Sequence, residues 1–130
     1  MTISNFFLVF VGGGLGAAVR FLVTTAAARW AAFPLGTLAV NAVGSFLMGL
    51  IMGAVLLLTE KYELIAEPLR LLLAVGFLGG LTTFSSFSFE TLLLLKGGSY
   101  LLAFCNIALQ LFTGLLLAAL GMALAKGLLR

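Results

Sequence analysis

The sequence predicts an all-α membrane protein with four transmembrane helices. Of its 130 residues, 63% are hydrophobic and 8% are charged, and the mean hydropathy is +1.29, so there is too little polar surface to cover a water-soluble globule. Residues 1–19, 30–59, 71–89 and 97–125 carry no charge. Each run is close to the roughly 20 apolar residues that cross a hydrocarbon core of about 30 Å. The runs are continuous rather than alternating, which favours helices over a β-barrel.

The expected spans are about 3–27, 35–58, 69–95 and 99–125, in a single domain of residues 1–130. The connections contain Arg29-Trp30 and Phe33-Pro34, a charged loop from Thr59 to Pro68, and Lys96-Gly97-Gly98. Functional groups are therefore expected within the membrane or at its faces. The first run has no basic residue before Arg20 and no cleavage pattern, so we do not expect it to be a signal peptide.

The ionisable residues exclude several classes of function. The chain has one cysteine and no histidine, and its four acids are all glutamates. A disulfide, a Cys/His metal site and a Cys–His catalytic pair are thereby excluded, and we do not expect an enzyme. The seven basic residues are scattered rather than clustered, which argues against a nucleic-acid partner.

The orientation in the membrane is only weakly specified. Four basic residues lie on the N-terminal side and two on the opposite side, while Arg20 lies within a span. This split permits insertion in both directions and an antiparallel dimer, although a single orientation with both termini in the cytoplasm is the alternative. Oligomerisation is expected because four short helices bury few polar groups and because glycines spaced i,i+4 allow close helix approach in lipid. These glycines are Gly12 and Gly16, Gly49 and Gly53, and Gly76 and Gly80.

The first two spans carry isolated polar residues. Arg20 lies about seven residues before the predicted end of its span, where a charge costs about 3 kcal/mol, so it either snorkels to the headgroups or serves an anion vestibule. In the second span Asn41 belongs to a small and polar strip, and its two N–H donors can coordinate an anion without a buried charge. An interhelical hydrogen bond is the alternative. The strip consists of Thr37, Asn41, Ser45, Gly49 and Gly53.

The third span is polar where it should be most apolar. We expect Gly79-Gly80 to weaken the helix near mid-membrane, where a break is tolerated only if the freed carbonyls are buried in protein or line a cavity. Bare carbonyls attract a cation. Five hydroxyl groups follow, and uncharged donors can replace the hydration shell of a small anion. They belong to Thr82, Thr83, Ser85, Ser86 and Ser88.

Aromatic and acidic residues complete this span. Phe84 and Phe87 are three residues apart, so their rings project from one helix face, and their positive edges can contact an anion. Ordinary packing is the alternative. Glu90 lies near the far end of the span, where it either reaches the interface or, as we expect, pairs with Arg20.

The fourth span carries a second polar track at helical spacing. Its side chains either line a pore or form a static ladder of interhelical hydrogen bonds. The track consists of Asn106, Gln110 and Thr113, next to Gly114.

Three segments together resemble the Fluc (CrcB) family of small fluoride channels over essentially the whole chain. The segments are residues 12–20, 36–46 and 76–90. The third is the most specific, with Gly79-Gly80, then Thr82-Thr83-Phe84-Ser85, then Phe87. One departure lies in the fourth span, where many family members have Tyr and Ser in place of Asn106 and Gln110.

The resemblance implies an antiparallel, dual-topology homodimer in the bacterial inner membrane. Fluoride would leave the cytoplasm passively through two narrow pores at the subunit interface, and a central structural Na⁺ would be held by the carbonyls of Gly79 and Thr82 from both subunits. Arg20 would serve the vestibule, and Glu90 would have a structural or ion-pairing role. The implied pore residues are Phe84, Phe87, Asn41, Ser86, Thr83, Asn106 and Gln110.

Two other functions compete with a channel. A proton-coupled small multidrug exporter also uses four short spans in an antiparallel dimer, but it needs a membrane-embedded carboxylate, and Glu90 lies near an edge. A non-transporting assembly subunit would explain the glycines and polar strips as packing. It would leave the hydroxyl and phenylalanine run of the third span unexplained.

Overall fold

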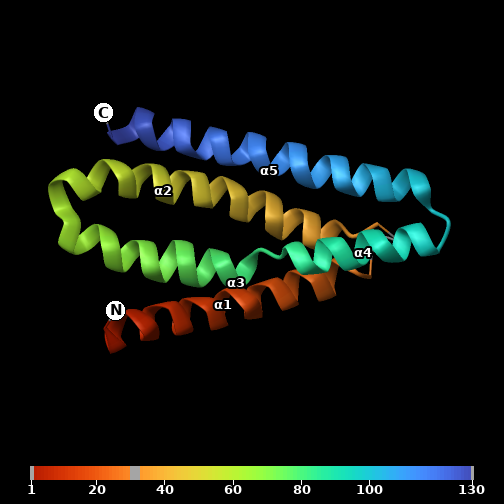
Figure 1. Ribbon diagram of the computed structural model, residues 1–130, viewed down its shortest axis with the longest axis horizontal. Coiled ribbons are helices and arrows are strands. Elements are labelled where there is room, and N and C mark those ends of the chain that lie inside the picture. The colour runs from red at the N-terminus through yellow and green to blue at the C-terminus, as the bar shows by residue number, and fades with distance from the viewer. Residues whose placement is uncertain (1, 30–32, 130) are drawn as a thin grey trace.

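The computed structural model describes residues 2–29 and 33–129, and of residues 59–65 it describes the backbone alone. All regular secondary structure in these residues is helical. Figure 1 shows long helices lying side by side, with both termini at the same end. The elements are α1 (Ile3–Ala27), α2 (Leu35–Leu69), the π-helix η1 (Arg70–Leu78), α3 (Gly79–Leu81), α4 (Phe84–Lys96) and α5 (Tyr100–Leu129).

Four helical stretches are long and apolar enough to cross a membrane, which confirms the predicted number. They are Ile3–Ala27, Leu35–Leu58, Ala66–Lys96 and Tyr100–Leu129. Local signals mark two of their ends. The Thr2 hydroxyl caps the start of α1 by accepting from the N–H of Asn5 at 3.4 Å. Gly98 has φ of +75° after α4, a conformation that glycine adopts without steric cost, and this permits the tight turn into α5.

The expectation of a charged loop from Thr59 to Pro68 is wrong. The backbone is helical from Leu35 through Leu69, and the chain reverses direction within this helix (Figure 1). The physical reason is that Leu, Glu, Lys and Ala, which dominate this stretch, are all good helix formers. Trp30, Arg130 and the side chain of Lys61, which entered the connection and orientation arguments, lie outside the described parts.

Close backbone contacts join the helices in two pairs, in which η1 and α3 lie against α1 and α2 lies against α5. Glycines permit both contacts, as their spacing predicted. A Cβ added to Gly16 would lie 2.8 Å from the backbone nitrogen of Leu81, and one added to Gly53 would lie 2.9 Å from Cβ of Ala125. Any larger residue would therefore force these helices apart.

The third span changes neighbours at two non-helical residues. Before them η1 and α3 contact α1, and after them α4 contacts α5. Thr82 and Thr83 have extended backbone, with φ and ψ of −83° and 153° and of −153° and 115°. The expected weak point, Gly79-Gly80, is helical instead, because Gly80 is held against the backbone of Gly13. The helix ends where tertiary bonds engage Thr83 rather than at the glycines.

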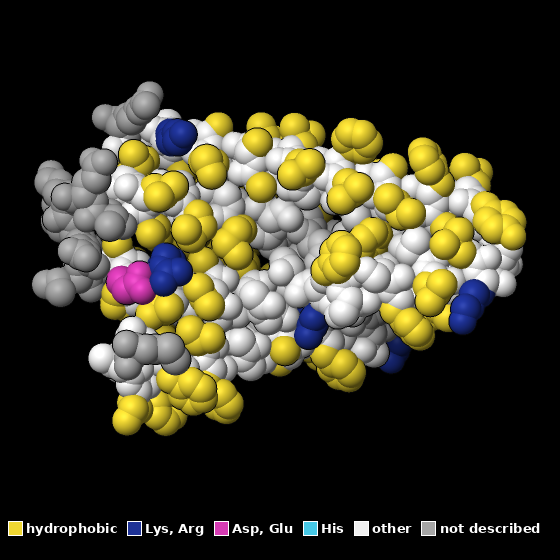
Figure 2. All heavy atoms as spheres, viewed as in Figure 1, with side chains coloured by type: hydrophobic (Ala, Val, Ile, Leu, Met, Phe, Trp, Pro, Cys, Tyr) yellow, Lys and Arg dark blue, Asp and Glu magenta, His cyan; other side chains and the backbone are white. Residues whose placement is uncertain are grey.

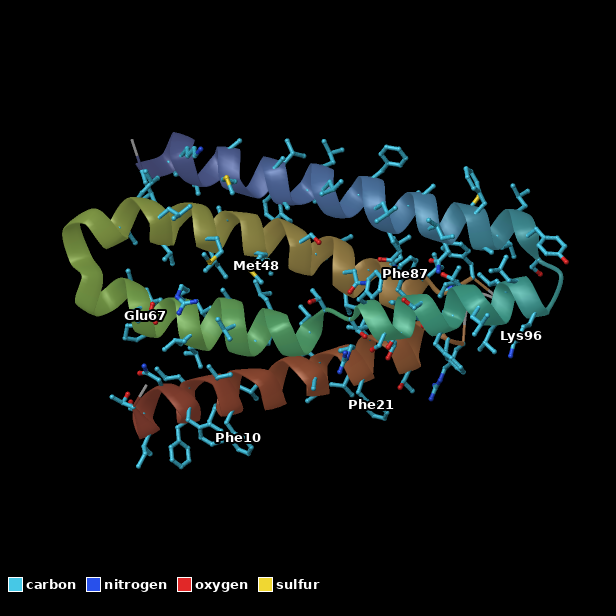
Figure 3. The ribbon with its side chains drawn as sticks, in the orientation of Figure 1. Phe10, Phe21, Met48, Glu67, Phe87 and Lys96 are labelled. Carbon is cyan, nitrogen blue, oxygen red and sulfur yellow. The ribbon has the colours of Figure 1, made fainter. Side chains whose placement is uncertain are left out.

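The outer surface is apolar. Figure 2 shows hydrophobic side chains spread over much of the face in view, around a central area of backbone and other side chains, with few charged ones among them. Phe10 and Phe21 point away from the bundle (Figure 3), and each is 66% exposed. The buried core is small and centres on Val40, Leu78 and Leu81. A surface of this kind is suited to lipid or to another subunit.

Candidate functional site

The interruption at Thr82 and Thr83 is held by one side chain of α2. The Asn41 carboxamide binds the Thr83 backbone on both edges, because its Oδ1 accepts from the Thr83 N–H at 2.8 Å and its Nδ2 donates to the Thr83 carbonyl at 3.1 Å. The Thr83 hydroxyl then caps α4 by accepting from the N–H of Ser86 at 3.1 Å. It also contacts the hydroxyls of Ser85 and Ser86 at 3.1 Å each. Side chains thus replace the missing helical bonds.

The interruption also frees backbone carbonyls. In a continuous helix the Thr83 N–H would bond to the carbonyl of Gly79, but here it donates to Asn41. The carbonyl of Thr82 lies 3.5 Å from Nη1 of Arg20, which is long for a hydrogen bond. Both carbonyls therefore keep acceptor capacity, and Gly79 lies exposed at the molecular surface.

A cavity of about 330 Å³ opens beside the interruption. Its wall includes both predicted phenylalanines, whose ring centroids are 5.4 Å apart with the planes at 65°. Phe87 is 8% exposed and points into the bundle between α4 and α2 (Figure 3), whereas Phe84 is 75% exposed. We call this space the break cavity. It is lined by Asn41, Gly44, Ser45, Met48, Thr82, Thr83, Phe84, Phe87, Gln110, Leu111 and Ala118.

Two buried amides of α5 complete the polar surroundings. Gln110 Oε1 accepts from Nδ2 of Asn41 at 3.0 Å. Asn106 Nδ2 donates to the Thr91 hydroxyl at 2.9 Å, and this hydroxyl donates to the Phe87 carbonyl at 2.8 Å. The other amide atoms, Gln110 Nε2 and Asn106 Oδ1, are buried without a hydrogen-bond partner. A buried polar atom without a partner is costly and marks a place where a ligand or water is needed.

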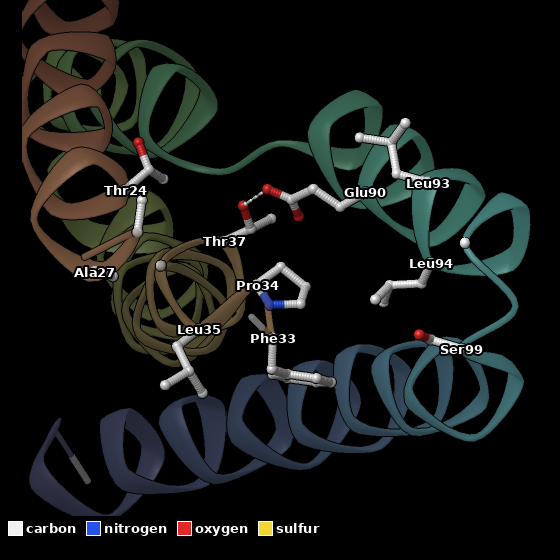
Figure 4. Close-up of a pocket in the computed structure, with 13 residues that line it drawn as sticks. Thr24, Ala27, Phe33, Pro34, Leu35, Thr37, Glu90, Leu93, Leu94 and Ser99 are labelled. Carbon is white, nitrogen blue, oxygen red and sulfur yellow. Dashed lines mark hydrogen bonds between the residues drawn. The ribbon is translucent and has the colours of Figure 1, made fainter. Parts of the chain in front are cut away.

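Arg20 and Glu90 line a second hollow together with Ser85 and Ser86. The expected ion pair between Arg20 and Glu90 does not form. Among the described residues, the one ion pair within 4.0 Å joins Glu67 and Arg70. Glu90 Oε1 instead accepts from the Thr37 hydroxyl at 2.6 Å (Figure 4). Glu90 Oε2 is buried without a partner.

Comparison with known proteins identifies the family. A family model described as "CrcB-like protein, Camphor Resistance (CrcB)" matches residues 7–122. The chain belongs to the CrcB family. Relatives of this CrcB chain include three proteins named "Fluoride-specific ion channel FluC". The one from Pyrococcus abyssi is 42% identical over 126 residues, covering 97% of this chain and 99% of the relative. Those from Shewanella woodyi and a Hydrogenobaculum species are 44% and 46% identical, covering 91% and 90% of this chain and 93% of each relative.

Some candidate residues of this CrcB chain meet at the break cavity, and others lie beside it or do not reach it. Asn41, Thr83 and Gln110 meet directly at the break cavity. Ser86 lies beside it through Thr83, and Asn106 reaches it only through Thr91, a residue that the sequence argument missed. The sequence offered one signal for Thr91, which is that its hydroxyl group directly precedes the run of leucines at 92–95. Thr113 donates to the carbonyl of Leu109 in its own helix at 2.6 Å.

Proposed function

We propose that this chain forms a passive, fluoride-selective channel that exports fluoride from the cytoplasm and so lowers its toxicity. Membership of the CrcB family supports this function, as do the relatives named fluoride-specific ion channels. An ion channel is not an enzyme, in agreement with the sequence. The observation that carries the proposal is the break cavity, in which two phenylalanine rings, hydroxyls and buried amides surround an opened helix.

The chemistry of the break cavity suits a small, strongly hydrated anion. A pore must return most of the hydration energy of fluoride without trapping the ion, and several moderate donors do this better than one fixed charge. Ring edges are positive and contribute in the same way. The guanidinium of Arg20, which shares the adjacent hollow with Ser85, Ser86 and the carboxyl group of Glu90, is the positive group that would attract an anion to the vestibule.

The functional unit that we propose is an antiparallel, dual-topology homodimer in the bacterial inner membrane, with the pores at the subunit interface. Polar groups on the outside of the single chain support a second copy. Gly79, Ser85 and Ser88 are exposed next to the helix interruption, which we place near mid-membrane. A backbone carbonyl that lacks its helical donor, as that of Gly79 does, is not left facing lipid. In the proposed dimer, a partner subunit covers these groups.

A structural Na⁺ fits the freed carbonyls at the same interface. Gly79 and Thr82 each present a carbonyl oxygen with acceptor capacity left over, the first because Asn41 has taken its helical donor and the second because Arg20 is 3.5 Å away. Carbonyl oxygens are suitable ligands for a hard cation. When bound, the ion would neutralise the carbonyl dipoles of the interruption and tie two subunits together there.

Anion efflux from liposomes tests the proposed function. The purified protein is reconstituted, valinomycin is added to relieve the membrane potential, and ion-selective electrodes compare fluoride with chloride. We expect fast fluoride release without chloride release. Release of neither ion would overturn the channel and favour an assembly subunit, or an exporter if a drug-dependent proton flux depends on Glu90.

A further inference from the structure

We propose that a second cavity, between the ends of α1 and α4 and the start of α2, binds a primary ammonium group through the carboxyl group of Glu90. We call it the end cavity. It has a volume of about 330 Å³ and shares none of its described lining residues with the break cavity. The inference does not depend on the proposed channel function. The lining residues that carry a side-chain oxygen are Thr24, Thr37, Glu90 and Ser99.

The Glu90 carboxyl group has one oxygen atom unused. Its Oε1 accepts from the Thr37 hydroxyl at 2.6 Å, whereas its Oε2 is buried and has no hydrogen-bond partner among the described residues. Figure 4 shows the Glu90 side chain extending from α4 toward α2, into the space that the lining residues enclose. A buried carboxylate oxygen without a donor is costly, and a positively charged N–H group is a partner that would satisfy it.

The described side chains do not supply this partner. Arg20 shares a hollow with Glu90, but the one ion pair within 4.0 Å in the described ranges joins Glu67 and Arg70. The described residues that line the end cavity include no lysine or arginine. A positive charge from outside the chain would therefore complete the site.

The end of α1 adds to the negative potential of the end cavity. Thr24, Ala27 and Ala28 line it, so the last turn of α1 lies against it. A helix C-terminus carries about half a negative charge, which a basic residue in the last turn can offset, but α1 has none there. Arg29, the next basic residue, is exposed and does not line the cavity. A carboxylate and a helix C-terminus at one cavity favour a cation over an anion.

The walls favour an organic ammonium group over a bare metal ion. A metal cation must exchange much of its hydration shell for oxygen atoms, but only four of the 13 lining residues carry a side-chain oxygen. Most of the others are apolar, such as Phe33 and Leu94, and suit contact with carbon atoms. A primary ammonium group has three N–H donors. Glu90 Oε2 accepts one, and the Thr24 oxygen is free to accept because its hydroxyl donates to the Arg20 carbonyl at 2.9 Å.

The position of the end cavity allows two sources of this group. The spans end here at Ala27 and Lys96 and begin at Leu35, so the cavity lies at the membrane surface, at the depth of the lipid headgroups. The headgroup of an aminophospholipid such as phosphatidylethanolamine presents a primary ammonium group at this depth. A small free amine reaches the same place from the water. The group recognised is the same, and the experiment separates the two sources.

The measurement is the unfolding temperature of the purified protein in detergent, which rises when a ligand binds the native state. The probes are dihexanoylphosphatidylethanolamine and methylammonium chloride. Their controls are dihexanoylphosphatidylcholine and tetramethylammonium chloride, which are fully methylated at nitrogen and have no N–H donor. We expect a primary ammonium probe to raise the unfolding temperature and both controls to leave it unchanged. A rise with the lipid alone identifies a headgroup as the ligand, and a rise with methylammonium shows that free amines bind.

Three variants assign the binding to the end cavity. Glu90→Gln keeps an oxygen that can accept from Thr37 but removes the charge, and it should bind at least about tenfold more weakly, as for a lost hydrogen bond to a charge. Glu67→Gln is the matched control, because it removes the same charge at a 49% exposed side chain outside this cavity and should respond as the wild type does. Leu94→Phe keeps the carboxyl group but fills the cavity, and it replaces Glu90→Gln if that variant does not fold.

Several results would overturn the inference. They are an unchanged unfolding temperature of the wild type with both primary ammonium probes, equal rises with the methylated controls, and a wild-type response from Glu90→Gln. If Glu90→Gln does not fold, a wild-type response from Leu94→Phe would overturn it instead. Fluoride efflux has no part in this test, so its failure would leave the proposed channel function intact.

Discussion

Two parts of the molecule differ in how they treat the helix backbone: the close contacts of Gly12, Gly16 and Gly80, which we call the glycine contacts, and the interruption at Thr82 and Thr83 with the break cavity, which we call the break region. In the glycine contacts, Gly12, Gly16 and Gly80 bring α1 against η1 and α3 by lacking side chains, and the backbone bonds stay within each helix. In the break region the helix opens, and Asn41 and Thr83 provide side-chain bonds in their place. A helix that satisfies its own backbone offers an ion no backbone group. Backbone carbonyls are freed where the helix is opened.

The comparison also separates the tightly packed part of the molecule from the part that has polar groups free to bind an ion. The glycine contacts tolerate no added atom, because the neighbouring backbone lies within van der Waals distance. In the break region a hollow persists between α2, α4 and α5, and buried amide atoms lack partners. We infer that the first region holds the scaffold and the second meets the ion. The following substitutions test this division.

The largest loss of stability is expected from Asn41→Ala in the break region. It removes the bonds to both sides of Thr83 and leaves a backbone N–H and a carbonyl without partners. At about 2 kcal/mol for each group, the free energy of unfolding should fall by about 4 kcal/mol. Thermal unfolding of the purified protein in detergent measures it. Asn41→Asp keeps the acceptor for the Thr83 N–H and should lose less; equal losses would show that this bond contributes little.

A smaller loss, about 3 kcal/mol, is expected from Gly16→Ala in the glycine contacts. The new methyl group would meet the backbone of Phe77 and Leu81, with 2.8 Å to the Leu81 nitrogen. Gly14→Ala is the matched control, because a Cβ there has no neighbour within 4 Å. The yield of monodisperse protein and its unfolding temperature report the difference. If both variants were equally stable, the close approach of α1 to α3 would not be needed.

The smallest loss is expected from Thr83→Val, which removes the cap of α4. The hydroxyl accepts from the Ser86 N–H at 3.1 Å, and loss of such a cap costs about 1 kcal/mol. Valine retains the shape and the extended backbone preference of threonine. Thr83→Ser keeps the oxygen and should stay near the wild type in the same unfolding assay. A Thr83→Val protein as stable as Thr83→Ser would exclude the capping role.

Hydropathy and residue type were enough to predict four helices and the polar side chains that gather at the centre. Long uncharged runs determine the spans, and an isolated polar side chain in lipid must find a hydrogen-bond partner on a neighbouring helix. The predictions that were wrong, the place of the helix break and the partner of Glu90, depend on hydrogen bonds between residues far apart in the sequence, which residue spacing does not reveal. Asn41 and Thr83 are 42 positions apart, so the end of α3 depends on a tertiary bond rather than on glycine content. Glu90 likewise bonds to the nearer hydroxyl of Thr37 and not to Arg20.

The central claim is that fluoride passes the two phenylalanine rings of the break region. Its most direct test is fluoride efflux from liposomes that contain Phe84→Ile or Phe87→Ile, at equal amounts of folded protein. Isoleucine keeps an apolar side chain without the positive ring edge. We predict a loss of about 100-fold in rate, the equivalent of roughly 3 kcal/mol of ion stabilisation, with the elution volume on gel filtration unchanged from that of the wild type. Wild-type fluoride rates from both variants would contradict the claim.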